Sequence, residues 1–486
     1  MKRRIVAIVA GVAVIAAGGV LIVRPWWAGR CSASFEEVPA AEMTKLHAVP
    51  LDQVDPNDFS GATRTSVREL LVAAQHPAAP LGRARSAVVV PHKGGVSAAR
   101  LINSHDGDVR FEIDGGGLIG TEYSGAVVQV DGETGKAVWG RRQVGYGVGG
   151  GNVADRMMLM HIPRGKAPRV AAVNPTDGEL DWCTTLGKDH NTSWRPTFDS
   201  AASGDAIFVV RESDAEQDSK DDNARDVRLS RLDAGSGKVK WNKPVENLSQ
   251  ADSLHVLRDQ LLLSPYRLDM NVDSWARITD PASTSKPVSG AIVARSAADG
   301  TRSWTYRGPD QRGWINNVLG TGKDVAVVIS RRSSQQGKRS VSESWLTGID
   351  RTGKEVWKHD FKGQFDYFRS ESFLVTGDLV ISHESRDPKT DRSELVARSL
   401  TDGTERWRAQ LTGIGAPLRR RSSEIVGNSL LTTSAAAGLM AVDLGSGAVT
   451  NPLPGEKFGR IDSIVSDGRT VTIDANGLFL TFDRAF

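Results

Sequence analysis

One short phrase recurs along the chain: a turn that contains glycine, followed four positions later by a tryptophan in a strand-like segment. The first copy is DGETGKAVW, in which Gly135 precedes Trp139. Successive tryptophans lie 43 to 63 residues apart. Self-similarity at this period indicates stacked supersecondary units, none of which can bury its apolar face alone. The six tryptophans of the phrase are Trp139, Trp182, Trp241, Trp304, Trp357 and Trp407.

The phrase has a fixed place within each unit. Strand-like stretches such as DLVISHES (378–385) and ELVARSL (394–400) precede the glycine turn, and TERWRAQL (404–411) follows it. A period of about 40–50 residues matches one four-stranded blade of a β-propeller. We therefore expect each tryptophan to be a structural staple that packs on the next blade. The longer intervals contain polar inserts at 214–223 and 331–338, which we expect to be solvated hairpin loops.

The number of blades depends on the two ends of the repeat region. A seventh turn, at Gly447, has Asn451 in the tryptophan position, and residues 461–483 then supply only two more strand-like stretches. Near the start, Gly107 lies four residues before Phe111. We predict that this segment is the missing outer strand of the last blade, with Phe111 as its staple, because such closure removes exposed sheet edges. The expected fold is an all-β, eight-bladed propeller over residues 86–486; seven blades and a terminal hairpin are the alternative.

Residues upstream of the turns favour one family. Val130-Asp131, Leu232-Asp233 and Val442-Asp443 lie nine and eight positions before the aromatic position, as do Val173-Asn174. This pattern resembles the A-x-D-x-x-T-G-K-x-x-W motif of PQQ-type β-propellers. That family includes quinoprotein alcohol dehydrogenases and BamB-like scaffold proteins of the bacterial outer membrane. The resemblance covers about residues 86–486 and implies eight blades, but a blade motif specifies an architecture and not a chemistry.

The N-terminus is an export signal or a membrane anchor. Lys2, Arg3 and Arg4 precede 19 uncharged residues, 5–23. At about 1.5 Å per residue, this stretch can just cross a bilayer core of about 30 Å. We favour a retained, single-pass transmembrane helix within residues 1–31, with a cleaved signal peptide or a lipoprotein signal at Cys31 as alternatives. Each places the bulk of the chain outside the cytoplasm at the cell membrane. Residues 32–85 are expected to be an extracytoplasmic tether with a short helix near 66–75.

A candidate binding rim lies in the links that join each outer strand to the next inner strand. Several links pair an aromatic residue with arginine, and both kinds of residue are enriched in interface cores. We expect this rim to bind an unidentified protein or an acidic ligand; an ordinary solvated surface is the alternative. The candidate residues are Trp194, Arg195, Arg312, Trp314, Tyr367, Arg369, Arg419, Arg420 and Arg460.

Signals for catalysis are weak. The G-x-G-x-x-G at Gly145 precedes a strand-like stretch instead of the helix that a dinucleotide site needs. The histidines have no metal-site spacing, and 61 basic against 58 acidic residues do not favour nucleic-acid binding. Cys31 and Cys183 could pair once, or Cys183 could be a small buried apolar residue.

Quinoprotein dehydrogenases, which the repeat resembles, use PQQ with calcium, and many carry an adjacent Cys-Cys disulfide that this chain lacks. We therefore expect a non-catalytic scaffold with no catalytic, cofactor-binding or metal-binding residues. One alternative is a PQQ-dependent alcohol or sugar dehydrogenase with PQQ and calcium. The other is an envelope sensor that works through a partner.

Overall fold

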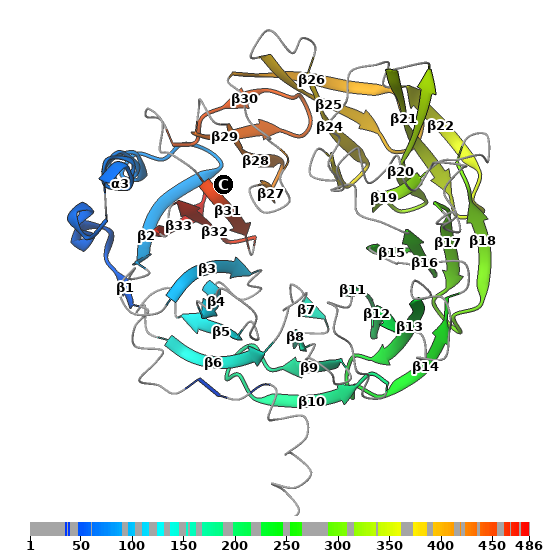
Figure 1. The fold of residues 1–486 in the computed structure, drawn as a ribbon. Coiled ribbons are helices and arrows are strands. Elements are labelled where there is room, and N and C mark those ends of the chain that lie inside the picture. The colour runs from blue at the N-terminus through cyan, green and yellow to red at the C-terminus, as the bar shows by residue number, and fades with distance from the viewer. Residues whose placement is uncertain are drawn as a thin grey trace, which may run out of the picture.

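Eight antiparallel sheets stand as blades around a central axis (Figure 1). Over the described residues, seven sheets have four strands and the eighth has five. The predicted eight blades are therefore confirmed, and the seven-bladed alternative is wrong. This computed structural model describes residues 35, 37–38, 47–59, 61–89, 96–102, 109–115, 124–130, 137–144, 152–153, 156–161, 168–187, 198–214, 225–245, 253–264, 290–308, 315–336, 339–360, 373–385, 392–412, 418, 423–434, 438–453, 461–466, 468–475 and 478–485.

Seven blades take their four strands in chain order, from the inner strand to the outer strand. Blade 1 contains β3 (Val96–Ile102), β4 (Val109–Gly115), β5 (Ser124–Val130) and β6 (Ala137–Val144). Blade 2 contains β7 (Asn152–Val153), β8 (Arg156–His161), β9 (Arg169–Val173) and β10 (Leu180–Thr185). Blade 3 contains β11 (Phe198–Ser203), β12 (Ala206–Asp214), β13 (Arg225–Asp233) and β14 (Val239–Pro244). Blade 4 contains β15 (Ser253–Leu257), β16 (Gln260–Ser264), β17 (Ile292–Ser296) and β18 (Arg302–Tyr306).

The second half of the ring follows the same order. Blade 5 contains β19 (Ile315–Thr321), β20 (Val325–Gln336), β21 (Arg339–Asp350) and β22 (Glu355–Asp360). Blade 6 contains β23 (Phe373–Thr376), β24 (Leu379–Ser385), β25 (Arg392–Ser399) and β26 (Glu405–Thr412). Blade 7 contains β27 (Ser423–Val426), β28 (Ser429–Ser434), β29 (Gly438–Asp443) and β30 (Val449–Thr450). Blade 8 contains β31 (Ile461–Ser466), β32 (Thr470–Ala475) and β33 (Leu478–Arg484), followed by two strands from the N-terminal region.

The ring is closed by β2 (Leu81–Val89), which is the fourth strand of blade 8. It pairs antiparallel with β33, with Ala87 opposite Leu480. Closure by an N-terminal strand is thus as predicted, but the predicted strand was wrong. Phe111 lies in β4, the second strand of blade 1, with Leu101 and Val128 as its two strand neighbours. A strand paired on both sides cannot be an outer strand, so the Gly107-to-Phe111 spacing was a chance likeness to the repeat phrase.

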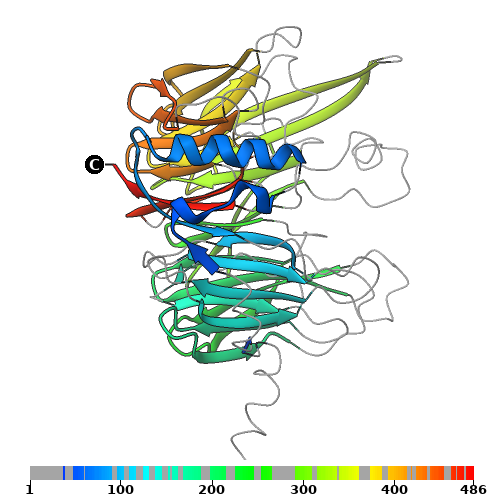
Figure 2. The same cartoon turned by 90° about the vertical axis from the view of Figure 1, so that its left-hand side faces the viewer.

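The N-terminal segment lies along the outer wall of the propeller. Helix α3 (Gly61–Ala74) buries Leu70 and Ala74 in the same apolar cluster as Leu480 of blade 8 (Figure 2). Strand β1 (His47–Val49) pairs with β2 as a fifth strand, and two 3₁₀ turns, η2 (Leu51–Gln53) and η3 (Pro56–Asp58), follow it. Over residues 47–89, the expected tether is therefore packed on the propeller.

The same segment also contacts blade 1. Phe35 is 1% exposed and packs between blades 1 and 2 beside Trp139. Glu37 forms an antiparallel bridge with Arg141 of β6, and the Val38 amide donates to Gly140 O at 2.9 Å. The N-terminal segment therefore contacts both blades that flank the closure of the ring, blade 1 through Phe35, Glu37 and Val38 and blade 8 through β1.

The apolar core is divided among the interfaces between blades. Residues 206–210 of β12 are all buried, since one face of the blade packs on blade 2 and the other on blade 4. This arrangement explains why middle strands are almost continuously apolar, although alternation is typical of a sheet with one solvated face. Stability therefore depends on contacts between neighbouring sheets.

Strand direction gives the ring two faces. Where the structure describes both, the first hairpin and the glycine turn of a blade lie together, as shown by the backbone hydrogen bonds Ala234 N to Asp205 O and Leu400 N to Asp378 O. We call this the turn face. The opposite end of each blade, which we call the link face, holds the hairpin between the second and third strands. There, too, each outer strand ends and the next inner strand begins.

The two polar inserts differ in what the structure describes. Residues 215–224 lie outside the described residues. The insert at 331–338 was expected to be a loop, but β20 continues through Gln336 and β21 begins again at Arg339. Here the extra residues lengthen a hairpin on the link face.

Candidate functional site

All nine predicted rim residues lie outside the described residues, so their side-chain arrangement stays a prediction. The described strands establish only where the links attach. Strand β18 ends at Tyr306 and β19 starts at Ile315, and both ends lie at the link face. The corresponding gaps contain Trp194, Arg195, Arg312, Trp314, Tyr367, Arg369, Arg419, Arg420 and Arg460.

Six tryptophans join consecutive blades through one repeated contact. The indole Nε1 of Trp357 donates to Leu400 O at 2.6 Å, in the glycine turn of the next blade. Trp357 is 8% exposed, and Trp139, Trp182 and Trp407 are similarly buried, whereas Trp241 and Trp304 are half-buried. The same bond joins Trp139 to Pro175 O (2.8 Å), Trp182 to Ala234 O (2.8 Å), Trp241 to Ala298 O (2.9 Å), Trp304 to Arg351 O (2.8 Å) and Trp407 to Leu444 O (2.7 Å).

The turn glycine lies directly against the indole of the preceding blade. Gly403 has φ of +71°, and a Cβ at this position would lie 2.8 Å from Cδ2 of Trp357. At Gly237 the corresponding distance, to Cε3 of Trp182, is 2.2 Å. Glycine is thus required for two reasons. The backbone has a positive φ, and a Cβ would overlap the indole. Only glycine allows the turn carbonyl to approach the indole N–H closely.

A second contact comes from the residue two positions after several of these tryptophans. Arg141 Nε donates to Gly178 O at 2.7 Å, and Thr184 Oγ1 donates to Gly237 O at 2.7 Å. At the interface of blades 4 and 5, Tyr306 donates its hydroxyl to Glu355 Oε1 at 2.9 Å. Burial and the Glu355 carboxylate raise the pKa of Tyr306, so the hydroxyl stays protonated and can donate.

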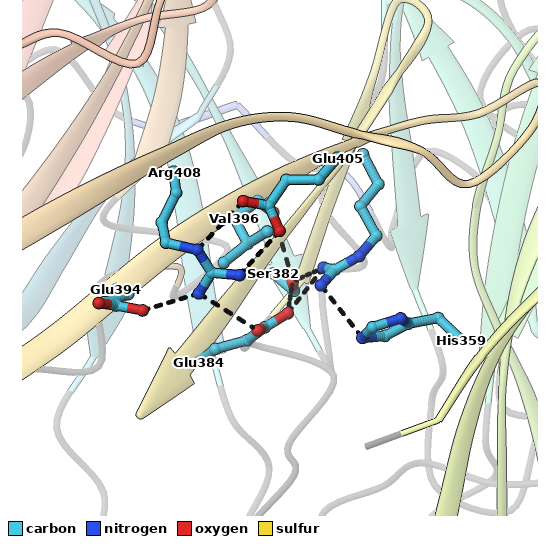
Figure 3. A network of polar contacts seen from close by, with 8 residues as sticks. His359, Ser382, Glu384, Glu394, Val396, Glu405 and Arg408 are labelled. Carbon is cyan, nitrogen blue, oxygen red and sulfur yellow. Dashed lines mark hydrogen bonds and ion pairs between the residues drawn. The ribbon is translucent and has the colours of Figure 1, made fainter. Parts of the chain in front are cut away.

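The corresponding residue at the interface of blades 5 and 6 is His359, which belongs to a larger polar network (Figure 3). Arg398 is buried, with 4% of its side chain exposed. Its Nη1 donates to Glu384 Oε1 at 2.7 Å and to Ser382 Oγ at 3.1 Å. Its Nη2 lies 3.1 Å from His359 Nε2. Because guanidinium groups only donate, Nε2 must be the unprotonated acceptor nitrogen of the imidazole.

Arg408 forms the second half of this network. Its Nε and Nη2 donate to the two oxygens of Glu405 at 3.1 and 2.7 Å, which is a bidentate pair. Its Nη1 donates to Glu394 Oε2 at 2.7 Å and lies 3.8 Å from Glu384 Oε2. Glu384 therefore connects the two arginines. Figure 3 shows its contact with Arg408 as a dashed line.

These contacts set the protonation states. Burial, followed by the charge of Arg398, lowers the pKa of His359, so its imidazole is neutral at pH 7. The bond from Arg408 lowers the pKa of Glu405, and the bond to Glu405 raises the pKa of Arg408. His359, Glu405 and Arg408 are thus in the protonation states that their hydrogen bonds require. The arrangement is a paired network that joins two blades.

Two buried titratable groups lie apart from this network. Burial lowers the pKa of His383 to about 4, and among the described residues its Nε2 has no hydrogen-bond partner. Burial raises the pKa of Glu424, on the inner strand of blade 7, to about 7. Because the pKa of each side chain differs between the folded and the unfolded chain, each makes the stability of the fold depend on pH.

The described part of the chain offers no constellation for metal chemistry. Within it, no group of three or more His, Cys, Asp or Glu side chains could hold a metal ion. Cys183 is disulfide-bonded, and the other cysteine of the chain, Cys31, lies outside the described residues. Among the helices that the structure describes, none is long and apolar enough to cross a membrane. The predicted anchor, residues 5–23, lies outside the described residues.

Sequence reasoning missed the buried network because its members are ordinary charged residues in strands. One signal was present. Arg398 lies nine positions before Trp407, where Leu232 precedes Trp241 and Val442 precedes Asn451 by the same distance. A charge in a position that other blades fill with an apolar side chain indicates a buried partner. Which partner it is depends on the neighbouring blade.

Eight blades, the Gly–Trp staples and the upstream Asp or Asn positions define a PQQ-type β-propeller. The family model described as outer membrane protein assembly factor BamB matches residues 71–264 and 288–480, which is more than half of the chain. The chain therefore belongs to this family. No curated protein matches it.

The solved structures that match the chain include a BamB protein, an alcohol dehydrogenase and a designed protein. BamB from Moraxella catarrhalis is 14% identical, with a TM-score of 0.40, and the match covers 80% of this chain and 99% of that one. Quinohemoprotein alcohol dehydrogenase from Comamonas testosteroni is 12% identical, with a TM-score of 0.48 and coverage of 92% and 84%. The computationally designed Ika8 protein is 12% identical, with a TM-score of 0.47 and coverage of 80% and 98%.

Proposed function

We propose that this protein is a membrane-anchored, extracytoplasmic propeller that acts as a non-catalytic scaffold and holds a protein partner on its link face. The observation that carries the proposal is the family match over both halves of the ring to an outer membrane protein assembly factor. The basic and apolar residues 1–23 support the anchor. The disulfide at Cys183 supports an oxidising compartment, where such bonds persist.

The blade interfaces support a role as a rigid platform. The six indole bonds and the turn glycines hold neighbouring blades in one register. Near the interface of blades 5 and 6, Arg398 and Arg408 form ion pairs with glutamates of blade 6. Such interfaces leave recognition to loops on a scaffold that does not deform, which is the usual division of labour in repeat folds.

Site-specific photocrosslinking in native membranes tests the scaffold. A photoreactive residue is placed at position 314 or 367, in the predicted rim, and at position 238 or 351 on the turn face as a matched control. We expect one defined protein adduct from the link face and none from the turn face. Arg312→Glu with Arg369→Glu should abolish the adduct. Equal crosslinking from both faces, or no specific adduct, would remove the link face as the binding surface.

A second candidate function is a PQQ-dependent dehydrogenase, which the repeat motif itself favours because quinoprotein enzymes share it. Calorimetric titration of the purified protein with PQQ and calcium, followed by dye-linked alcohol oxidation, separates the two. We expect neither binding nor turnover. Saturable PQQ binding together with turnover would contradict the scaffold proposal and support the dehydrogenase.

A further inference from the structure

The hairpin of blade 5 extends beyond its own sheet. Strands β20 and β21 have 12 residues each and pair along their whole length, from Val325 opposite Asp350 to Gln336 opposite Arg339. The inner strand β19 pairs with β20 only as far as Arg331, and the outer strand β22 begins its pairing with β21 at Trp345. Past these points, within the described residues, the two strands pair only with each other. They form a two-stranded ribbon, which Figure 2 shows projecting from the ring.

This ribbon is basic. Residues 332–344 contain Arg332, Lys338 and Arg339 against Glu343, a net charge of +2. The segment has no aromatic residue, and Val341 is its one large apolar residue. Protein interface cores are enriched in aromatic residues, so this composition does not fit a protein-binding core. It fits attraction to a negatively charged surface.

The ribbon and the first described residues of the chain are directed toward the same face of the propeller. The ribbon joins the second and third strands of its blade, so it projects from the link face. Residues 35–38 run antiparallel to β6, which runs from the turn face to the link face. Followed backwards from Val38 to Phe35, the chain therefore heads toward the link face. Only residues 24–34 separate Phe35 from the predicted anchor, and 11 residues span less than about 40 Å.

We propose that the blade 5 ribbon binds the anionic lipid headgroups of the membrane in which the chain is anchored. The proposal rests on the membrane anchor of the proposed function. Blades 1 and 5 lie on opposite sides of the ring (Figure 1), so the anchor and the ribbon give the propeller two separate attachments to the bilayer. The free part of each strand has about six residues and reaches about 20 Å, at about 3.3 Å per residue. The link face is thereby turned toward the membrane.

Headgroup quenching in nanodiscs tests the ribbon directly. The full-length chain is reconstituted into discs of phosphatidylcholine alone or with phosphatidylglycerol, with a headgroup quencher, and carries a fluorophore at Ser334→Cys. A control label at Lys238→Cys lies on the turn face. We expect quenching at position 334 only with phosphatidylglycerol and no quenching at position 238.

Charge variants then identify the cause. Each basic residue at a membrane surface contributes about 5-fold to binding, so Arg332→Gln with Arg339→Gln should lower the ratio of bound to free ribbon ~30-fold. The matched control, Arg351→Gln with Lys354→Gln, removes two charges from the turn face of the same blade and should change nothing. Equal quenching in neutral and anionic discs, or none in either, would overturn the proposal.

Failure of the anchor gives a different result. A chain that does not float with neutral vesicles has no anchor, which contradicts the proposed location. In that case, the ribbon is tested by the binding of the unanchored chain to anionic vesicles. Binding that the Arg332→Gln and Arg339→Gln pair abolishes would support the ribbon, and absence of binding would overturn it.

Discussion

Gly403 packs against the indole of Trp357, which lies in the preceding blade, while Trp407, four residues after Gly403, packs against Gly447 of the following turn. The phrase that repeats in the sequence thus unites two residues with different partners. Each copy supplies the glycine for one interface and the tryptophan for the next. This alternation makes each blade depend on both neighbours, and it joins the repeats into one cooperative ring.

Gly403→Ala should destabilise the protein by about 2–4 kcal/mol, because alanine meets both a left-handed backbone and the indole of Trp357. Gly377→Ala in the same blade is the matched control. Gly377 has φ of +56°, with nothing within 4 Å of the added Cβ. Gly377→Ala should therefore lower the free energy of unfolding by only about 1–2 kcal/mol, through the left-handed backbone alone. Chemical denaturation measures both changes, and equal losses would show that the indole contact adds nothing.

Trp357→Ala should cost about 3–5 kcal/mol through the lost apolar burial. Trp357→Phe keeps most of the apolar contact but removes the donor to Leu400 O, and should cost about 1–3 kcal/mol because a buried carbonyl loses its partner. Val356→Ala is the control, since Val356 is 45% exposed on the same strand. Its effect should stay within about 0.5 kcal/mol. A mild Trp357→Ala variant would contradict the stapling role.

Arg398→Met should destabilise the protein by about 3–5 kcal/mol, because it leaves the buried Glu384 carboxylate short of one of its two arginines. Adding Glu384→Gln should recover part of this loss, since the uncompensated charge is removed as well. A double-mutant cycle measured by thermal unfolding gives the coupling energy. Strictly additive effects would show that the pair is not coupled.

Phe35→Ala should cost about 3–5 kcal/mol if the N-terminal segment is part of the folded domain. Glu37→Ala removes an ion pair whose carboxylate is 78% exposed. Because solvent screens such pairs, its cost should be about 0–1 kcal/mol. Unfolding of the full chain in denaturant compares the two variants. An unchanged Phe35→Ala protein would mean that residues 35–38 contribute no stability to the propeller.

The pH dependence of stability should contain two opposed contributions. The pKa of His383 falls from 6.5 to about 4 on folding, so the unfolded chain binds the extra proton in this window and stability rises with pH. The pKa of Glu424 rises from 4.5 to about 7, so the folded protein binds the extra proton and stability falls with pH. Each contribution is about 3 kcal/mol and the two overlap between pH 4.5 and 6.5.

Single variants separate these contributions. In Glu424→Gln, stability should rise with pH through this window; in His383→Gln it should fall. Thermal unfolding from pH 4.5 to 7 reports both slopes, and the double variant should have a weaker dependence than either. Slopes of the same sign in the two single variants would contradict the assignment.

Most of the fold could be predicted from the sequence because the repeat is local. The glycine turn, the aromatic position and the apolar strands recur in seven repeats, and the two strand-like stretches within residues 461–483 indicated an eighth blade. The strand that closes the ring could not be found in this way. Leu81–Val89 carries no copy of the phrase, and its position is decided by hydrogen bonds to β33, nearly 400 residues later.

The sequence by itself therefore determined the blade, its period and the residues available to join one blade to the next. Only the tertiary structure decided which residues meet: Gly403 with Trp357, Arg398 with Glu384 and His359, and Phe35 with the interface of blades 1 and 2. The physical reason is that a single blade buries neither face alone. The contacts of Gly403 with Trp357, of Arg398 with His359 and of Phe35 with blade 2 are made between sheets, and they exist only when the ring brings the blades together.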